Sequence, residues 1–257
     1  MTKLILVTGA AGLLGYQHVA SLIGAGHTVV ASDLKIENLE AAFAKLNSEN
    51  LIFEQLDVTD EELIKNLSYK YNFDVLINNA AIDAKVSDDG MSGGGRLEAF
   101  SVKNFNREIS VGLTGAISCA KYIGSRMNAL SGGKIINIAS DLSIISPDQR
   151  LYEVDGVEIE AQPKKPVSYS VIKHGLIGLT KYLSTYWPEK VTCNALSPGG
   201  VLVDQNEVFL TKIKDRIPMN RMASLTEYHG ILKFLVSDES DYMNGQNIIM
   251  DGGRSVW

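Results

Sequence analysis

Hydrophobic residues follow two spacings that alternate along the chain. Short runs rich in β-branched residues predict strands over Leu4–Thr8, Thr28–Asp33, Leu51–Leu56, Val75–Asn78, Lys134–Ser140, Val191–Leu196 and Asn247–Met250. Longer stretches with apolar residues three and four positions apart predict helices over Leu13–Gly24, Ile36–Leu46, Glu61–Leu67, Phe105–Met127, Ser168–Tyr186 and Leu225–Val236. Strict alternation of strand and helix implies parallel strands joined by right-handed crossovers. The pattern therefore predicts an α/β fold with a three-layer, doubly wound parallel sheet.

Length and composition favour one domain over residues 1–257. A chain of 257 residues fits one large α/β domain, and 45% hydrophobic with 21% charged residues is ordinary for a packed protein. No apolar stretch approaches the roughly 18 to 20 residues of a membrane-spanning helix. The opening apolar run is short and leads into a glycine turn, so we interpret it as a strand and not a signal peptide.

Charge and cysteine content exclude several classes of partner. The formal net charge of −6 disfavours nucleic acid and anionic membranes. Cys119 and Cys193 have no C-x-x-C spacing, which predicts neither a disulfide framework nor a zinc site and suits a reducing cytoplasm. The four histidines lack the spacing of a metal or triad site, and we assign them to structure or surface.

A glycine turn follows the first predicted strand and opens the first helix. Gly9 permits a tight turn, Gly12 allows a pyrophosphate to approach the backbone, and Gly15 allows close packing of helix and strand. Asp33 ends the second strand, where a carboxylate can accept hydrogen bonds from ribose hydroxyls and repel a 2′-phosphate. NAD is therefore favoured over NADP, although Lys35 stands close by. The alternative for the glycine turn is a purely structural connection between strand and helix. The alternative for Asp33 is an ordinary turn residue.

Tyr169 and Lys173 are four positions apart in a predicted helix, so phenol and ammonium share one face. Tyr186 and Lys190 have the same spacing, but Pro188 lies between them and interrupts a helix. A tyrosine has an ordinary pKa near 10, and a neighbouring cation favours its phenolate. Ser140, at the end of a predicted strand, can orient the reacting oxygen. Ser140, Tyr169 and Lys173 are thus the candidate catalytic residues.

Two segments interrupt the alternation of predicted strands and helices. Ile82–Asn104 contains the glycine-rich Gly90–Arg96, which lacks the Gly-Lys-Ser/Thr ending of a phosphate-binding loop and is interpreted as a flexible surface loop. The segment from about 143 to 167 carries charges of both signs and separates Ser140 from Tyr169. We expect it to be an insertion that covers the substrate, with a neutral insertion as the alternative.

These motifs together resemble the short-chain dehydrogenase/reductase family along nearly the whole chain, which implies a Rossmann fold. Further matching motifs are Leu56–Thr59, Asn78–Ala81, Asn194–Gly199, Ile217–Ala223 and Asn244–Gly253. The resemblance implies homodimers or homotetramers, in keeping with the long apolar faces of Phe105–Met127 and Ser168–Tyr186. It also implies cofactor contacts at Gly9, Gly12, Leu13, Leu14, Gly15, Asp33, Asp57, Val58, Asn79, Ala80, Ala81, Tyr169, Lys173, Pro198, Gly199 and Val201.

Four departures from that family limit what can be transferred. The glycine spacing resembles the extended branch that acts on nucleotide sugars, and Ser140 and Tyr169 are 29 positions apart, about twice the usual separation. Gly112 stands where the family often has an asparagine that anchors a water in a proton relay. Val203 stands where a threonine often contacts the nicotinamide amide. The long separation suggests a large or polar substrate.

The leading hypothesis is NAD-dependent interconversion of a secondary alcohol and a ketone on a polar, sugar-like or sugar-nucleotide substrate. Tyr169 would take the hydroxyl proton, Ser140 would steady the oxygen, and Lys173 would lower the phenol pKa. The alternatives are a sugar-nucleotide epimerase or dehydratase and a catalytically weak NAD-binding regulatory protein. The run Asp141–Arg150 and Trp257 resemble enzymes of flagellin-modification and sialic-acid-like sugar pathways, with Arg150, Lys164 or Lys165 meeting an anionic group.

Overall fold

A seven-stranded parallel sheet forms the centre of the molecule, in a computed structural model that describes residues 1–82 and 95–257. The strand order is β3-β2-β1-β4-β5-β6-β7. The strands are β1 (Leu4–Thr8), β2 (Thr28–Asp33), β3 (Leu51–Gln55), β4 (Val75–Asn78), β5 (Gly133–Ile138), β6 (Val191–Pro198) and β7 (Asn247–Met250). The chain winds outward in one direction from β1 to β3 and in the other from β4 to β7. The change of direction between β1 and β4 creates a crevice beyond their carboxyl ends, where ligands bind in such sheets.

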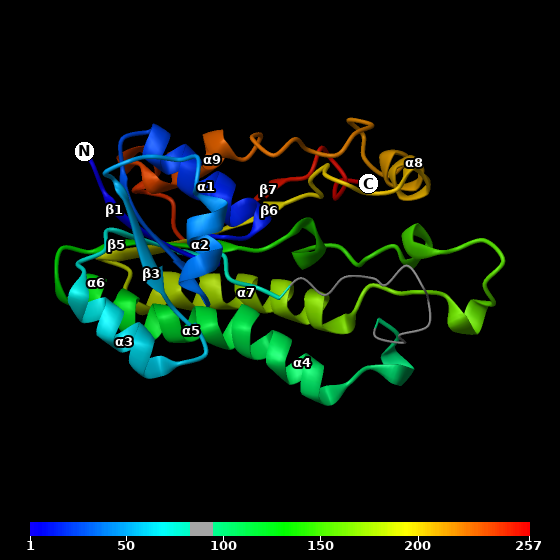
Figure 1. Ribbon diagram of the computed structural model, residues 1–257, viewed down its shortest axis with the longest axis horizontal. Coiled ribbons are helices and arrows are strands. Elements are labelled where there is room, and N and C mark those ends of the chain that lie inside the picture. The colour runs from blue at the N-terminus through cyan, green and yellow to red at the C-terminus, as the bar shows by residue number, and fades with distance from the viewer. Residues whose placement is uncertain (83–94) are drawn as a thin grey trace.

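Helices cover both faces of the sheet, which makes the three layers (Figure 1). One face carries α1 (Leu13–Gly24), α2 (Ile36–Ala42) and α9 (His229–Val236). The other face carries α3 (Glu61–Lys70), α7 (Val167–Tyr186) and a continuous helical run. That run comprises α4 (Val102–Ile109), the π-type turn η2 (Ser110–Thr114), α5 (Gly115–Cys119), a second π-type turn η3 (Ala120–Gly124) and α6 (Ser125–Ala129). The predicted three-layer fold is confirmed.

Side chains that alternate along each strand contribute to two hydrophobic cores, one on each face of the sheet. Ile5 and Val7 of β1 point into the core beneath α1 and α9, whereas Leu6 points into the core beneath α3 and α7. All three are fully buried. Burial on both faces explains why these strands read as continuous apolar runs and not as an alternating pattern.

Several element boundaries differ from the prediction. The strand expected to reach Ser140 ends at Ile138, the helix expected to reach Leu46 ends at Ala42, and the helix expected from Leu225 begins at His229. Helix α8 (Glu207–Lys214) was not predicted. The insertion contains only the short 3-10 turns η5 (Gln149–Tyr152) and η6 (Ile159–Ala161). Most of the glycine-rich segment lies outside the described residues, so its interpretation as a flexible loop stays a prediction.

Among residues 1–82 and 95–257, none of the helices is both long and apolar enough to cross a membrane.

A buried histidine between α1 and α9 makes stability depend on pH. His18 is 1% exposed, and neither ring nitrogen has a hydrogen-bond partner among the described residues. Burial, followed by repulsion from His229, lowers the pKa of His18 from 6.5 to about 4. Below pH 6.5 the unfolded chain therefore binds a proton that the folded chain rejects. We expect the free energy of unfolding to fall by about 3 kcal/mol between neutral pH and pH 4 through this group alone.

Urea unfolding of the His18→Leu variant across this pH range tests the effect. The variant should lose less stability on acidification than the wild type, whereas His174→Leu, at an exposed position, should keep the wild-type slope. Equal slopes for the wild type and His18→Leu would contradict the assignment.

Candidate active site

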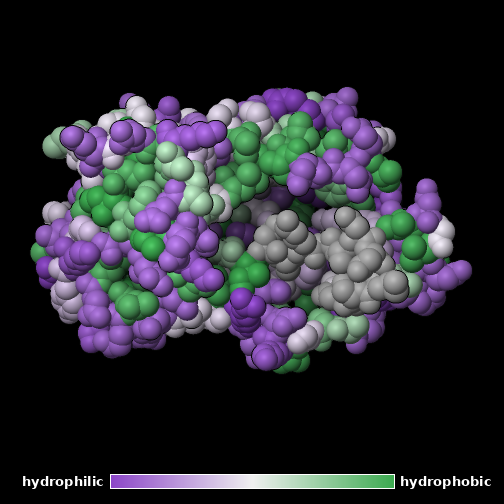
Figure 2. All heavy atoms as spheres, in the orientation of Figure 1, coloured by the Kyte–Doolittle hydropathy of each residue, from purple (hydrophilic) through white to green (hydrophobic). Residues whose placement is uncertain are grey.

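A large open cavity of about 1750 Å³ lies beyond the carboxyl ends of the strands. It extends from the glycine turn after β1 to the insertion and α8. In the view of Figure 2, the molecule is hollowed near the middle, and hydrophobic residues lie along part of the border of this hollow. The cavity therefore occupies the crevice that the strand order creates.

The glycine turn forms the end of this cavity next to α1. Gly9 has a φ of +61°, and a Cβ there would lie 2.7 Å from the Cα of Ala80. A Cβ on Gly15 would collide with the carbonyl oxygen of Gly9. A Cβ on Gly12 would meet only that oxygen, at 3.3 Å, and Gly12 lines the cavity. The turn thus brings bare backbone and the amino end of a helix to the surface of the cavity, which fits a dinucleotide pyrophosphate.

Asp33 stands beside this turn at the end of β2. Its Oδ2 accepts the Ala11 N–H at 3.1 Å, and its Oδ1 accepts the Leu34 N–H at 2.9 Å. The carboxylate also lines the cavity. These two hydrogen bonds fix an acceptor where the adenosine ribose of a dinucleotide would lie.

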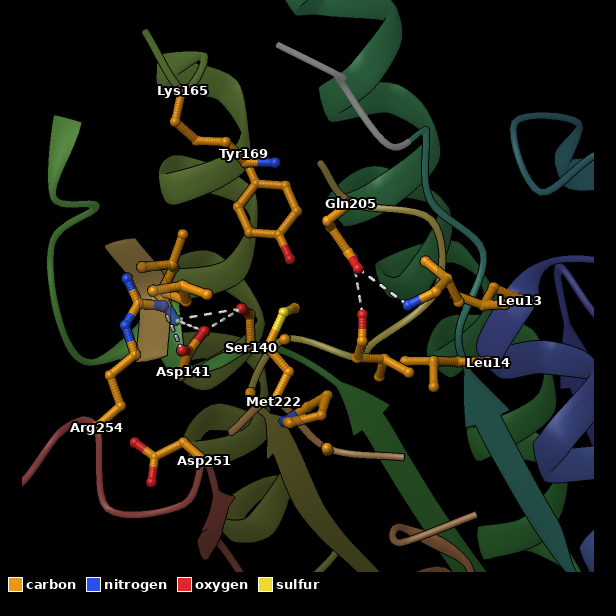
Figure 3. Close-up of a pocket in the computed structure, with 18 of the residues that line it drawn as sticks. Leu13, Leu14, Ser140, Asp141, Lys165, Tyr169, Gln205, Met222, Asp251 and Arg254 are labelled. Carbon is orange, nitrogen blue, oxygen red and sulfur yellow. Dashed lines mark hydrogen bonds and ion pairs between the residues drawn. The ribbon is translucent and has the colours of Figure 1, made fainter. Parts of the chain in front are cut away.

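All three candidate catalytic residues line this cavity. Tyr169 and Lys173 lie one turn apart on α7, and Ser140 follows β5. In Figure 3 the Tyr169 hydroxyl points toward Ser140. The Lys173 Nζ donates to the Ile138 carbonyl at 2.9 Å and lies 5.7 Å from the centroid of the Tyr169 ring. Lys173 is 8% exposed, so its charge acts on the phenol with little screening by solvent.

This arrangement can move one proton at a substrate oxygen placed between the two hydroxyls. In such an arrangement a phenol such as that of Tyr169 can exchange the proton, a hydroxyl such as that of Ser140 can orient the oxygen, and an ammonium such as that of Lys173 can favour the phenolate. The nicotinamide, when bound, supplies hydride acceptance and donation. The protein residues supply position, charge and a proton.

The insertion packs against α8 along the far side of the cavity. Leu151 is buried with Ile213 of α8, and the rings of Tyr152 and Phe209 lie 5.9 Å apart. The Lys212 Nζ donates to the Glu153 carbonyl at 2.7 Å. Residues 151–155 of the insertion also line the cavity. That the insertion covers a substrate stays a prediction.

Arg150, the candidate substrate contact on the insertion, is oriented by another residue. Its Nε and Nη2 each donate to Asp148 at 2.8 Å, and its side chain is 72% exposed. Arg216 also contacts Asp148. The hydrogen bonds from Arg150 and Arg216 hold the pKa of the Asp148 carboxyl well below its usual range. Arg150 is not among the described residues that line the cavity.

The structure divides the other candidate cofactor residues into two groups. Those that line the cavity are Leu13, Leu14, Asn79, Ala81, Pro198, Gly199 and Val201. Three others are not among its described lining residues. Asp57 accepts the N–H and hydroxyl of Thr59, Val58 packs against Gly115, and Ala80 lies against Gly9.

The two departures at Gly112 and Val203 have local explanations. Gly112 lies in the π-type turn η2, and a Cβ there would lie 2.9 Å from Cγ2 of Ile172, so a larger side chain would require Ile172 to shift. The Val203 N–H donates to Gln205 Oε1 at 2.9 Å, and the Gln205 amide donates to the Val201 carbonyl. Gln205, which lines the cavity, was missed by sequence reasoning. It supplies a polar group in the loop where Val203 has none.

A buried ion pair beside Ser140 was also missed. The Ser140 hydroxyl donates to Asp141 Oδ1 at 2.9 Å, and Arg254 Nη1 donates to Asp141 Oδ2 at 2.7 Å (Figure 3). The Arg254 and Asp141 side chains are 11% and 4% exposed, and both line the cavity. An arginine near the end of a chain carries no sequence signal of its partner, since the two residues are 113 positions apart.

Comparison with known proteins identifies the family of this chain. A family model described as "Enoyl-(Acyl carrier protein) reductase" matches residues 9–255. An "NAD-dependent glycerol dehydrogenase" of Listeria innocua is 27% identical over 99% of this chain and 94% of its own. A "trans-4-hydroxycyclohexanecarboxylate dehydrogenase" of Sinomonas cyclohexanicum is 30% identical, over 99% of this chain and 93% of its own.

A solved structure shows the same architecture. A short chain dehydrogenase of Leptospira borgpetersenii with bound NAD+ superposes with a TM-score of 0.85 at 27% identity, covering 99% of this chain and 93% of the other. The chain belongs to the short-chain dehydrogenase/reductase family. It is an oxidoreductase that acts on CH–OH groups with a nicotinamide cofactor.

Proposed function

We propose that the protein interconverts a secondary alcohol and a ketone on a small, highly hydroxylated substrate, with NAD as the cofactor. The observation that carries this proposal is the meeting of Tyr169, Ser140 and Lys173 in the cavity. In oxidation, the substrate carbon loses a hydride to the nicotinamide while its oxygen loses a proton to Tyr169. Lys173 stabilises the phenolate that receives the proton.

The character of the cavity supports a polar substrate. Glu153, Asp155 and Asp204 line it on the side of the insertion and the loop after β6. Carboxylates accept hydrogen bonds from hydroxyl groups, so this side suits a sugar-like molecule better than an acyl chain. The names of the glycerol and hydroxycyclohexanecarboxylate dehydrogenases, which are relatives of this chain, agree with an alcohol substrate. The flagellin-modification and sialic-acid-like subgroup gains no support from these relatives and stays a prediction.

Spectrophotometric assay of NAD reduction tests the proposal directly. The purified protein would be mixed with NAD and, separately, glycerol, threitol, gluconate and a sugar nucleotide. Net NADH formation with any of these alcohols supports the proposal. It would also eliminate the epimerase or dehydratase alternative, which returns the hydride to the substrate, and the regulatory alternative. Failure of every alcohol with both NAD and NADP would count against the proposed substrate class.

The preference for NAD rests on the fixed carboxylate of Asp33. A 2′-phosphate beside it would be repelled. We expect the Asp33→Asn variant, which keeps an acceptor for the Ala11 N–H, to lower the ratio of NAD to NADP affinity by about tenfold or more, equivalent to about 1.4 kcal/mol. Dissociation constants for both dinucleotides measure this ratio. Glu37→Gln, which removes a nearby exposed charge, should leave it unchanged; an unchanged ratio in Asp33→Asn would refute the role.

Assembly and location are further parts of the proposal. The predicted homodimer or homotetramer is supported by exposed apolar groups on the two long helical faces, including Ile117, Val171, Tyr182 and Tyr186.

The proposed cytoplasmic location is supported by Cys119 and Cys193, which are buried free thiols. Burial raises the pKa of each thiol to about 12, so both are unreactive.

A further inference from the structure

We propose that Lys165 is a positioning residue that favours the phenolate form of Tyr169, as a second cation beside Lys173. This inference rests on the proposed function, because it concerns the proton that Tyr169 exchanges with the substrate. It also gives the insertion a role in the chemistry, since Lys165 belongs to that segment.

The geometry places Lys165 closer to the phenol ring than Lys173. The Lys165 Nζ lies 4.1 Å from the centroid of the Tyr169 ring, against 5.7 Å for the Lys173 Nζ. A cation over an aromatic face is attracted by the ring quadrupole. When the phenol loses its proton, the negative charge spreads partly into the ring, so attraction to an ammonium over that face increases. The contact thus favours the deprotonated form over the neutral one.

The surrounding chain holds Lys165 in this position. Its backbone N–H donates to Gln149 Oε1 at 2.8 Å, which ties it to the turn η5 of the insertion. Pro166 follows as the N-cap of α7, and Tyr169 comes on the first turn of the helix. In Figure 3 the Lys165 side chain extends along α7 to Tyr169.

Helix stability does not account for a cation at this place. The positive end of the helix dipole disfavours a lysine next to the amino end of α7, and the first turn of α7 contains no acidic residue. The contact with Tyr169 offers the ammonium a compensating interaction. That interaction is strongest when Tyr169 is negatively charged.

Other charged groups on the same cavity make a second cation useful. Asp141 is paired with Arg254, and Glu227 with Arg221. The Asp251 carboxylate accepts the N–H groups of Gly253 and Ser255. The remaining carboxylates on the substrate side of the cavity are Glu153, Asp155 and Asp204. These three carboxylates disfavour a phenolate, and a cation close to Tyr169 acts in the opposite direction.

The test compares three substitutions by ultraviolet titration of tyrosinate. The signal of Tyr169 is the difference between each protein and the same protein carrying Tyr169→Phe, recorded without substrate. Lys165→Met removes the charge and keeps an apolar side chain, whereas Lys165→Arg keeps the charge. Lys164→Met removes the neighbouring charge. Circular dichroism checks that each variant is folded, and Lys165→Gln replaces Lys165→Met if the latter is not.

We expect Lys165→Met to raise the pKa of Tyr169 by about one unit, which lowers the phenolate fraction about tenfold below that pKa. Lys165→Arg and Lys164→Met should leave it near the wild-type value. Where an alcohol substrate has been found, the acid limb of the kcat profile should move by the same amount. Because the titration needs no turnover, it separates failure of this inference from failure of the proposed function. An unchanged pKa in Lys165→Met, or an equal rise in Lys165→Arg or Lys164→Met, would overturn the proposal.

Discussion

Replacing Tyr169 by phenylalanine is expected to lower kcat for alcohol oxidation by about 10²- to 10⁴-fold, the usual contribution of a positioned proton-transfer group. The substitution removes one oxygen and keeps the ring. It therefore removes the proton acceptor but preserves the packing of the ring on α7 and its contact with Lys165. Affinity for NAD should change much less than kcat, because the glycine turn and Asp33, which also line the cavity, are unchanged. Steady-state kinetics and NAD titration of the folded variant measure both quantities.

A matched control is available at the other end of the same helix. Tyr186 is also followed by a lysine four residues later, but it ends α7 and its side chain is exposed. Tyr186→Phe should keep wild-type turnover. Near-wild-type kcat in Tyr169→Phe would show that another group handles the proton.

These two tyrosines also illustrate what the sequence could predict. Their spacings to lysine are identical, and Pro188 distinguished them because proline cannot continue a helix. The structure agrees: α7 ends at Tyr186, before Pro188. The strands were equally predictable, since continuous apolar runs between turns are typical of a sheet buried on both faces.

Contacts between distant segments could not be predicted in this way. Arg254 is the clearest case, because its partner Asp141 lies 113 positions away in the chain. Helix α8 is short and its packing partners lie in the insertion, so its apolar positions made no strong periodic signal. At Gly112 the sequence showed a missing asparagine but not the Ile172 side chain that occupies the space. In each case the reason lies in a tertiary neighbour.

The buried ion pair next to Ser140 leads to the largest expected effect on stability. Arg254→Met keeps much of the length of the side chain but leaves the Asp141 carboxylate buried without its cation. Removing one partner of a buried pair costs about 3 to 5 kcal/mol, because an uncompensated charge remains in a poorly hydrated place. We expect a loss of this size in the free energy of unfolding, measured by chemical denaturation. Turnover should fall as well, because Asp141 also accepts the Ser140 hydroxyl.

Two further variants separate the pair from a general loss of packing. Adding Asp141→Asn to Arg254→Met removes the unpaired buried charge of the Asp141 carboxylate, so the double variant should be more stable than Arg254→Met alone. Arg221→Met breaks a more exposed ion pair, to Glu227, and should remain close to wild type. If Arg254→Met were as stable as Arg221→Met, the Asp141 to Arg254 pair would not hold the C-terminal segment against the loop that carries Ser140. The position of Ser140 would then be set by β5 and by the Leu142 N–H, which donates to the Ser140 Oγ at 3.2 Å.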